Sequence, residues 1–161
     1  MKYIKYLQFL ALALFLLPLS SIAQDCVDYH LVGDCYFDRQ RDYKIYSQSK
    51  SLSMNPLETI DLNVIFYGQK DYILSFCSHK KMLPIHFVLI DQETNKVLYD
   101  NEDDHYIESV GIGFDATKPL TIRINLLARK ATEEDIQDYL VCMGLLIQFK
   151  NYDKKTVDIR M

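Results

Sequence analysis

Residues 60–77 read IDLNVIFYGQKDYILSFC, and this stretch decides the expected fold. Apolar side chains recur at every second position in both halves of it, and the turn-forming letters GQKD separate the halves. The apolar positions on one face of each half are Leu62, Val64, Phe66, Tyr72, Leu74 and Phe76. A period of two is the spacing of a half-buried β-strand. The stretch therefore predicts two strands joined by a tight turn.

The same period continues through most of the chain. Further strands are expected at residues 42–54, 84–91, 96–100, 105–114, 119–127 and 140–150. Gly111 and Gly113 loosen one of these segments and predict a β-bulge there. A helical pattern is confined to residues 132–139, TEEDIQDY, where Thr132 is a suitable N-cap and acids occupy the first turn. About eight short strands with one short helix predict an all-β protein, an antiparallel β-sandwich or jelly roll.

The N-terminus has the pattern of a secretory signal peptide. Lys2 and Lys5 precede an apolar run at residues 7–19, and Ser21 and Ala23 are the small residues that precede a cleavage site. The apolar run is shorter than the roughly 20 residues that a membrane-spanning helix needs. We therefore expect a signal peptide at 1–23, a single domain at 24–161, and a secreted or periplasmic protein that is not inserted in the membrane after cleavage.

Four cysteines follow the predicted leader, which indicates disulfides in an oxidising compartment. Asp25 is a poor neighbour for lipidation of Cys26, so we expect Cys26 to be an ordinary cysteine. Of the three pairings that four cysteines allow, we favour Cys26–Cys35, across a segment rich in turn formers, and Cys77–Cys142. Cys77 and Cys142 both point away from the apolar stripes of their strands, so this pairing predicts that the two strands are neighbours. Free buried thiols at these two positions are the alternative.

Three stretches resemble a known family. LNVIFYGQKDYILSFC (62–77), IHFVLIDQETNKVLYDN (85–101) and FDATKPLTIRINL (114–126) are similar to successive strands and turns of the bacterial pre-peptidase C-terminal domain. The likeness covers roughly residues 57–128 and implies a small accessory β-sandwich that serves binding, secretion or folding. The overall build also resembles small stand-alone envelope proteins of Gram-negative bacteria. Neither resemblance implies catalytic residues.

An acidic run, YDNEDDHY at 99–106, lies between two expected strands. Its candidate cation ligands are Asp100, Glu102, Asp103 and Asp104. Carboxylates from a loop suit calcium, although the run has neither the spacing nor the glycine of an EF-hand loop. Calcium is therefore the one candidate cofactor. The alternative is a solvated turn whose charges discourage edge-to-edge aggregation.

The sequence favours a binding function over catalysis. The formal net charge is −4, which argues against nucleic acid as a partner. We predict a non-catalytic binding or accessory module of the cell envelope, with an envelope or extracellular protein or a glycan as its partner. One alternative is a secreted hydrolase with a site near His79 or His105. Another is a structural subunit that assembles by adding its terminal strand, residues 156–161, to a neighbour.

Overall fold

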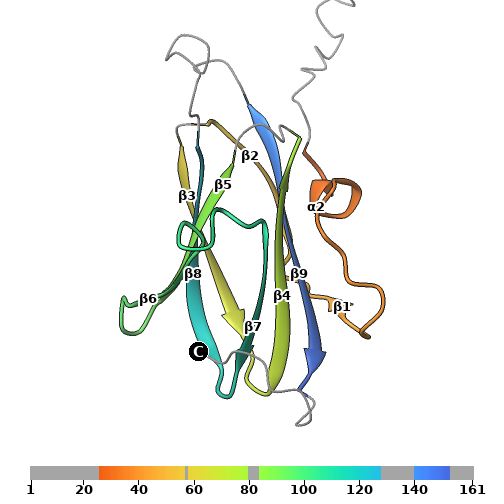
Figure 1. Cartoon of the computed structure of the whole chain (residues 1–161), viewed down its shortest axis with the longest axis vertical. Coiled ribbons are helices and arrows are strands. Elements are labelled where there is room, and N and C mark those ends of the chain that lie inside the picture. Colours follow the sequence, from red (N-terminus) through yellow and green to blue (C-terminus); the bar gives the residue numbers. More distant parts are fainter. Residues whose placement is uncertain (1–25, 57, 80–83, 128–139, 153–161) are drawn as a thin grey trace, which may run out of the picture.

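The computed structural model describes residues 26–56, 58–79, 84–127 and 140–152. Nine strands in this part of the chain form two antiparallel sheets that pack face to face (Figure 1). Their bounds are β1 Lys44–Ile45, β2 Lys50–Met54, β3 Thr59–Phe66, β4 Lys70–Ser78, β5 Ile85–Asp91, β6 Val97–Asp100, β7 Ser109–Phe114, β8 Lys118–Leu126 and β9 Val141–Asn151. The predicted all-β sandwich is confirmed.

The two sheets are assembled from alternating parts of the sequence. In the first, here called sheet A, β1 and β2 lie along one side of β9, followed by β4 and then β7. In the second, sheet B, the order is β3-β8-β5-β6. The predicted turn at Gly68 joins β3 to β4, so it carries the chain from sheet B to sheet A instead of forming a hairpin within one sheet.

The space between the sheets is filled by apolar side chains that alternate along the strands. Leu120, Ile122 and Ile124 of β8 are fully buried, as are Phe87 and Leu74 from the neighbouring and facing strands. Aromatic rings concentrate at one end of the core, where Tyr72 packs edge-on to Phe66 at 4.9 Å between centroids. Burial raises the pKa of Tyr72 to about 12, although its hydroxyl oxygen accepts a hydrogen bond from the Tyr67 N–H that acts in the opposite direction.

Several local expectations need correction. The segment 42–54 is two strands, β1 and β2, because the Ser49 hydroxyl accepts the Ile147 N–H (3.0 Å) where a continuous strand would use its backbone. The glycine-containing strand β7 pairs with β4 in unbroken register, and the irregularity lies instead between Leu89 and Ile90. The described helix is α2, Tyr29–Val32, whereas the predicted helix at 132–139 lies outside the described residues.

The predicted signal peptide and the terminal residues 156–161 also lie outside the described residues. Within the described ranges, no helix combines the length and the apolar character needed to cross a membrane.

Candidate functional site

The N-terminal part of the described chain, residues 26–43, forms an arm over the outer face of sheet A (Figure 1). Helix α2 contacts β9 and β2, yet none of its four residues is buried. A helix this short gains little from its own hydrogen bonds, because nucleation is unfavourable. Its position must therefore be fixed by contacts to the sheet.

Two disulfides attach the arm to the sheet. Cys26 is bonded to Cys142 of β9, and Cys35 to Cys77 of β4. The predicted pairing of Cys26 with Cys35 and of Cys77 with Cys142 is therefore wrong, and all four cysteines of the described chain are in bonds. Two disulfides are typical of proteins in an oxidising compartment, in agreement with a periplasmic or secreted location.

The register of the sheet explains the correction. The expected adjacency is confirmed, since β4 pairs with β9, but the residue opposite Cys77 is Gly144. Cys142 lies two positions further along β9, and diagonal neighbours in a sheet are about 7–8 Å apart, too far for a disulfide. Both thiols instead face outward on sheet A, where the arm brings Cys26 and Cys35 to them.

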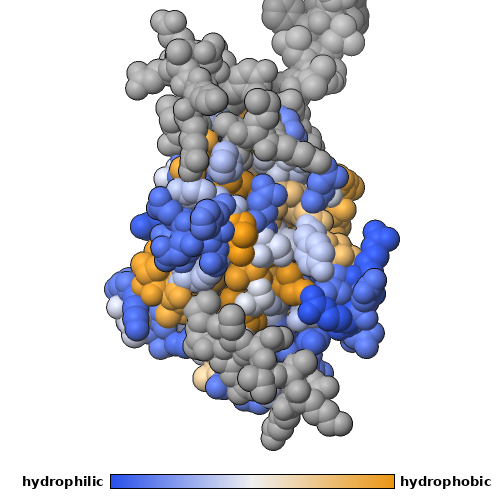
Figure 2. Space-filling model, in the orientation of Figure 1, coloured by the Kyte–Doolittle hydropathy of each residue, from blue (hydrophilic) through white to orange (hydrophobic). Residues whose placement is uncertain are grey.

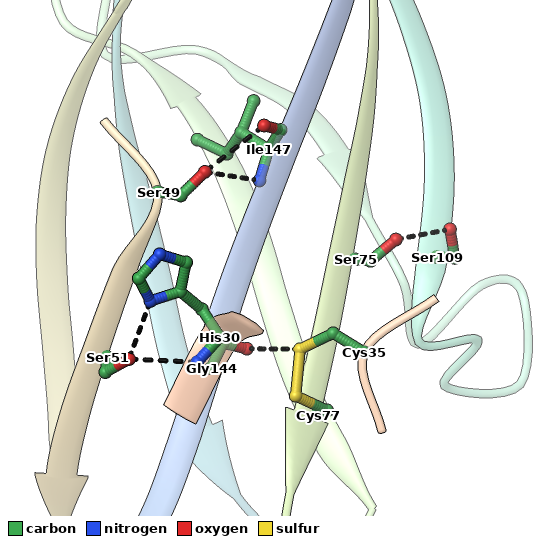
Figure 3. Close-up of a disulfide and its surroundings, with 9 residues drawn as sticks. All are labelled: His30, Cys35, Ser49, Ser51, Ser75, Cys77, Ser109, Gly144 and Ile147. Atoms are coloured by element: carbon green, nitrogen blue, oxygen red, sulfur yellow. Dashed lines mark hydrogen bonds between the residues drawn. A yellow bond between two sulfur atoms is a disulfide. The ribbon is translucent and has the colours of Figure 1, made fainter. Parts of the chain in front are cut away.

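Gly144 allows the arm to approach the sheet closely (Figure 3). A Cβ atom at this position would lie 2.7 Å from the His30 Cα and 2.9 Å from the Cys77 Sγ. It would also lie 3.0 Å from the Sγ of Cys35, whose sulfur is 3.5 Å from the Gly144 carbonyl oxygen. Any side chain here would therefore push the helix and one disulfide off the strand.

Hydrogen bonds from α2 to the edge of the sheet add to this attachment. The Ser51 Oγ accepts the backbone N–H of His30 (2.9 Å) and lies 2.7 Å from its Nδ1 (Figure 3). A groove of about 420 Å³ runs beside this contact between α2 and β2. Its lining includes Val27, Leu52 and Ser53.

The distal part of the arm is held by an amide instead of a disulfide. The Gln148 side chain is fully buried on the outer face of β9, and its Oε1 accepts the Asp38 N–H (2.8 Å). Its Nε2 donates to the Asp38 carbonyl (3.0 Å), so the amide pairs with the arm as a neighbouring strand would. Sequence reasoning did not single out either residue, although a glutamine in the middle of an apolar strand is a signal of a buried polar contact.

Asp38 also closes the turn that follows. Its Oδ1 accepts the N–H groups of Gln40 and Arg41, and its Oδ2 accepts the Arg41 Nε at 2.6 Å. Burial acts to raise the pKa of Asp38, but these hydrogen bonds outweigh it and lower the pKa below its ordinary value. The carboxylate is thus kept charged where it orders the turn.

The fixed arm presents a group of exposed apolar side chains, here called the arm surface. Its members and their exposed fractions are Val27 (64%), Leu31 (51%), Val32 (78%), Tyr36 (51%) and Phe37 (37%). They account for five of the eleven large hydrophobic residues exposed in the described chain. Figure 2 shows apolar residues at the position that α2 occupies in Figure 1, with hydrophilic residues below them. Such a concentration is characteristic of an interaction site.

The predicted calcium ligands are only partly brought together. The loop that carries them is organised by Asn101, which is fully buried and donates its Nδ2 to the carbonyls of Ile85 and Ile107. Its Oδ1 accepts the Phe87 N–H at 2.9 Å. The asparagine, which sequence reasoning placed among the acidic residues without a role of its own, therefore ties the loop to β5.

The acidic side chains around Asn101 have separate contacts. The Tyr99 hydroxyl donates to Asp104 (2.7 Å) and the Tyr106 hydroxyl donates to Glu102 (2.7 Å), while Asp103 is exposed. Burial comes first and the hydrogen bond to Asp104 second among the effects that raise the pKa of Tyr99. Asp103 and Asp104 do not join a ligand group with Asp100 and Glu102 in the described chain.

A group of three potential ligands forms around His86 of β5, which sequence reasoning did not single out. Ligand atoms of His86, Asp100 and Glu102 lie within 4.8 Å of one another. The His86 Nε2 is 2.9 Å from the Asp100 Oδ1, and its Nδ1 is 3.0 Å from the Asn125 Oδ1. One imidazole and two carboxylates fit a transition metal better than calcium, which takes six to eight oxygen ligands. Calcium binding stays a prediction.

The Asp100 carboxylate of this group already accepts hydrogen bonds from the protein. Burial acts to raise the pKa of Asp100, but the N–H of Glu102 and the ring of His86 together lower it below its ordinary value. The contact to His86 is therefore a satisfied ion pair or hydrogen bond in its own right.

The two histidines named for the hydrolase alternative, His79 and His105, have different surroundings. His79 follows β4, and its Nδ1 accepts the N–H of Cys142 (3.0 Å). His105 is exposed in the acidic loop and has a positive φ of 59°. Neither belongs to a cluster of three or more His, Cys, Asp or Glu ligands among the described residues. The hydrolase stays an untested alternative.

Comparison with known proteins identifies no family for this chain. No family model matches the chain, so the resemblance to the pre-peptidase C-terminal domain has no support from that comparison. No curated protein matches either. Among solved structures, Aeromonas hydrophila PliG, a periplasmic lysozyme inhibitor of g-type lysozyme, is similar with a TM-score of 0.45 and 8% identity, over 71% of this chain and 93% of that chain. At this similarity, any function must be argued from the chain's own residues.

Proposed function

We propose that this chain is a non-catalytic binding protein of the periplasm or the extracellular space, and that it binds a partner protein through the arm surface. The observation that carries the proposal is the covalent attachment of an exposed apolar segment: two disulfides flank α2, and α2 buries no residue of its own. The apolar side chains of this segment contribute little to the core. A rigid apolar surface, by contrast, favours association because little conformational entropy is lost on binding.

The charge around the arm surface indicates the chemistry of the partner. Arg39 and Arg41 lie two and four positions after Phe37 and Lys44 begins β1, whereas Asp28 and Asp34 flank α2 and the chain as a whole is acidic. The guanidinium of Arg39 lies 5.8 Å from the centre of the Phe37 ring, so apolar and cationic groups adjoin. We therefore infer a partner whose binding surface is apolar and carries acidic residues where it meets the Phe37 end of the arm surface.

Site-specific cross-linking tests the proposal in the cells that produce the protein. A photoreactive phenylalanine analogue replaces Leu31 on the arm surface or, as a matched control, Val97 on β6, which is similarly exposed (51% and 52%). We expect a discrete protein adduct from position 31 and none from position 97. Adducts of equal yield from both positions, or none from position 31, would contradict the proposal.

A second measurement uses the purified pair. Leu31→Lys should raise the Kd for the cross-linked protein about tenfold or more, because a central apolar contact is lost and a charge is buried. Val97→Lys should leave the Kd unchanged. Equal effects of the two substitutions would assign binding to a different surface.

A further inference from the structure

A second feature of the arm is a basic pocket of about 370 Å³, located where the arm meets the ends of β1 and β9. Its lining residues are Arg41, Asp42, Lys44, Phe149, Lys150 and Asn151. Lys70 of β4 adjoins the pocket, since its Nζ lies 3.1 Å from the Asn151 Oδ1. Four cations thus gather at one site of a chain whose net charge is negative.

Aromatic rings contact three of these four cations. The Nζ of Lys150 lies 5.0 Å from the centre of the Tyr43 ring, and the guanidinium carbon of Arg41 lies 5.8 Å from it. The Nζ of Lys70 lies 4.8 Å from the centre of the Phe149 ring. These contacts favour the charged groups without neutralising them, because a ring has no net charge.

Acidic groups near the pocket balance only part of this charge. Asp38 forms an ion pair with the Nε of Arg41, and Asp42 is the one carboxylate among the lining residues. Asp71 is opposite Lys150 in the pairing of β4 with β9, so it is a third acid to be counted. Lys44 is exposed, and both Lys44 and Lys150 line the opening. Clustered cations around a concave, partly aromatic wall attract an anion and raise its local concentration.

We propose that this pocket binds the carboxylates of an acidic peptide segment. The inference rests on the proposed function in one respect: continuity with the arm surface makes a protein segment the carrier of the anion. Phe149, which lines the pocket, offers apolar contact to the hydrocarbon stem of a Glu or Asp side chain. Asn151 and Asp42 can pair with amide groups of a peptide backbone. An inorganic oxyanion would give the Phe149 ring no apolar contact and the Asp42 carboxylate no amide donor.

The probe is an acetylated and amidated hexaglutamate peptide, with hexaglutamine as the uncharged control, and binding is followed by calorimetry at low and high salt. We expect hexaglutamate alone to bind, and its affinity to fall with salt. Lys44→Gln combined with Lys150→Gln should weaken binding about tenfold, since two of the four cations at the pocket are lost.

A matched variant removes the same charge elsewhere: Lys50→Gln combined with Lys96→Gln, both exposed residues away from the pocket. It should leave binding unchanged. Equal loss in the two double variants would show attraction by net charge only and overturn the pocket. Displacement of the peptide by an equimolar concentration of inorganic phosphate would assign the pocket to phosphate groups and overturn the peptide as ligand.

The arm variant separates this inference from the proposed function. Leu31→Lys should bind hexaglutamate as the unaltered protein does, because position 31 does not line the pocket. If hexaglutamate fails to bind while cross-linking from position 31 succeeds, the pocket is overturned and the arm surface stands.

Discussion

The outer faces of the two sheets differ in how they are covered. Among the described residues, the strands of sheet B alternate between buried and accessible side chains, and the accessible ones form its outer face. Sheet A covers its outer face with the arm, and seven consecutive residues of β4, Tyr72–Ser78, are buried. Covering a face with an arm that buries little apolar surface requires other attachments, here two disulfides and the Gln148 amide.

The polar side chains on the two outer faces differ in the same way. On sheet B, polar residues pair with one another across strands, as in the bidentate contact of Arg123 with Asp61 (both distances 2.8 Å). On sheet A, the polar residues Ser75 and Gln148 are buried and fully paired. In the described part of the chain, the arm adds to sheet A an apolar surface that two disulfides attach, and sheet B has no such attached segment.

Removal of the disulfides should have the largest effect on the arm and on the protein. The bonds Cys26–Cys142 and Cys35–Cys77 span 116 and 42 residues. In the chain-entropy model, replacing both cysteines of a pair with serine costs about 5 kcal/mol for the first and about 4 kcal/mol for the second. Denaturant unfolding of the two double variants measures the cost. A loss below about 1 kcal/mol for both would mean that the arm is not coupled to the sheets.

Gly144→Val tests the close approach of the arm. The added side chain would overlap α2 and the Cys35–Cys77 disulfide, so we expect a loss of about 3 kcal/mol and incomplete disulfide formation. Peptide mapping without reduction, together with denaturant unfolding, checks both. Gly111→Ala is the control, because a Cβ there meets only the Tyr72 carbonyl oxygen at 3.9 Å. Equal losses would mean that β-strand glycines, and not the arm, account for the effect.

Gln148→Leu and Gln92→Leu together compare the loss of a buried amide with the loss of an exposed one. The first substitution leaves the N–H and carbonyl of Asp38 buried without their partner, which costs about 2 kcal/mol. Gln92→Leu removes an exposed amide that donates to Asn63 and Thr121, and should cost less than about 0.5 kcal/mol. Hydrogen exchange of the arm amides should rise only in the first variant. Unchanged exchange there would contradict the role given to Gln148.

Acid should affect the turn after β5 through Asp91. The hydrogen bond from Lys118, joined by the N–H of Thr94, lowers the pKa of Asp91 from 3.8 to about 2. A lowered carboxylate pKa stabilises the fold above the unfolded value, so this contribution should disappear as the pH falls from about 4 to 2. Asp91→Asn should flatten stability against pH in that window, whereas Asp103→Asn, in the exposed part of the acidic loop, should not. Parallel profiles would exclude this role for Asp91.

The smallest effect should come from the exposed ion pair of sheet B. A double-mutant cycle of Asp61→Asn and Arg123→Gln should give a coupling of about 0.2–1 kcal/mol, reduced by salt, because both side chains are about half exposed. A coupling above about 2 kcal/mol, insensitive to salt, would show that the outer face of sheet B is covered by something as well.

Most of the core could be predicted from the sequence because alternation is a local property. Of the six apolar positions assigned to one face in residues 60–77, five are buried and Leu62 is half-buried. The site could not be predicted in the same way. Gln148 and Asp38 are 110 residues apart, and the spacing of the cysteines allowed three pairings of which the local one was wrong.

The sequence by itself determined the class of the fold, since a period of two and the turn residues act over a few positions of the chain. It also indicated that the cysteines belong in bonds, because four of them follow a predicted export signal. Only the tertiary structure decided which cysteines meet, which sheet face is covered, and where apolar and cationic side chains gather. These depend on the register of β4 against β9 and on the close approach at Gly144, where residues distant in the chain come into contact.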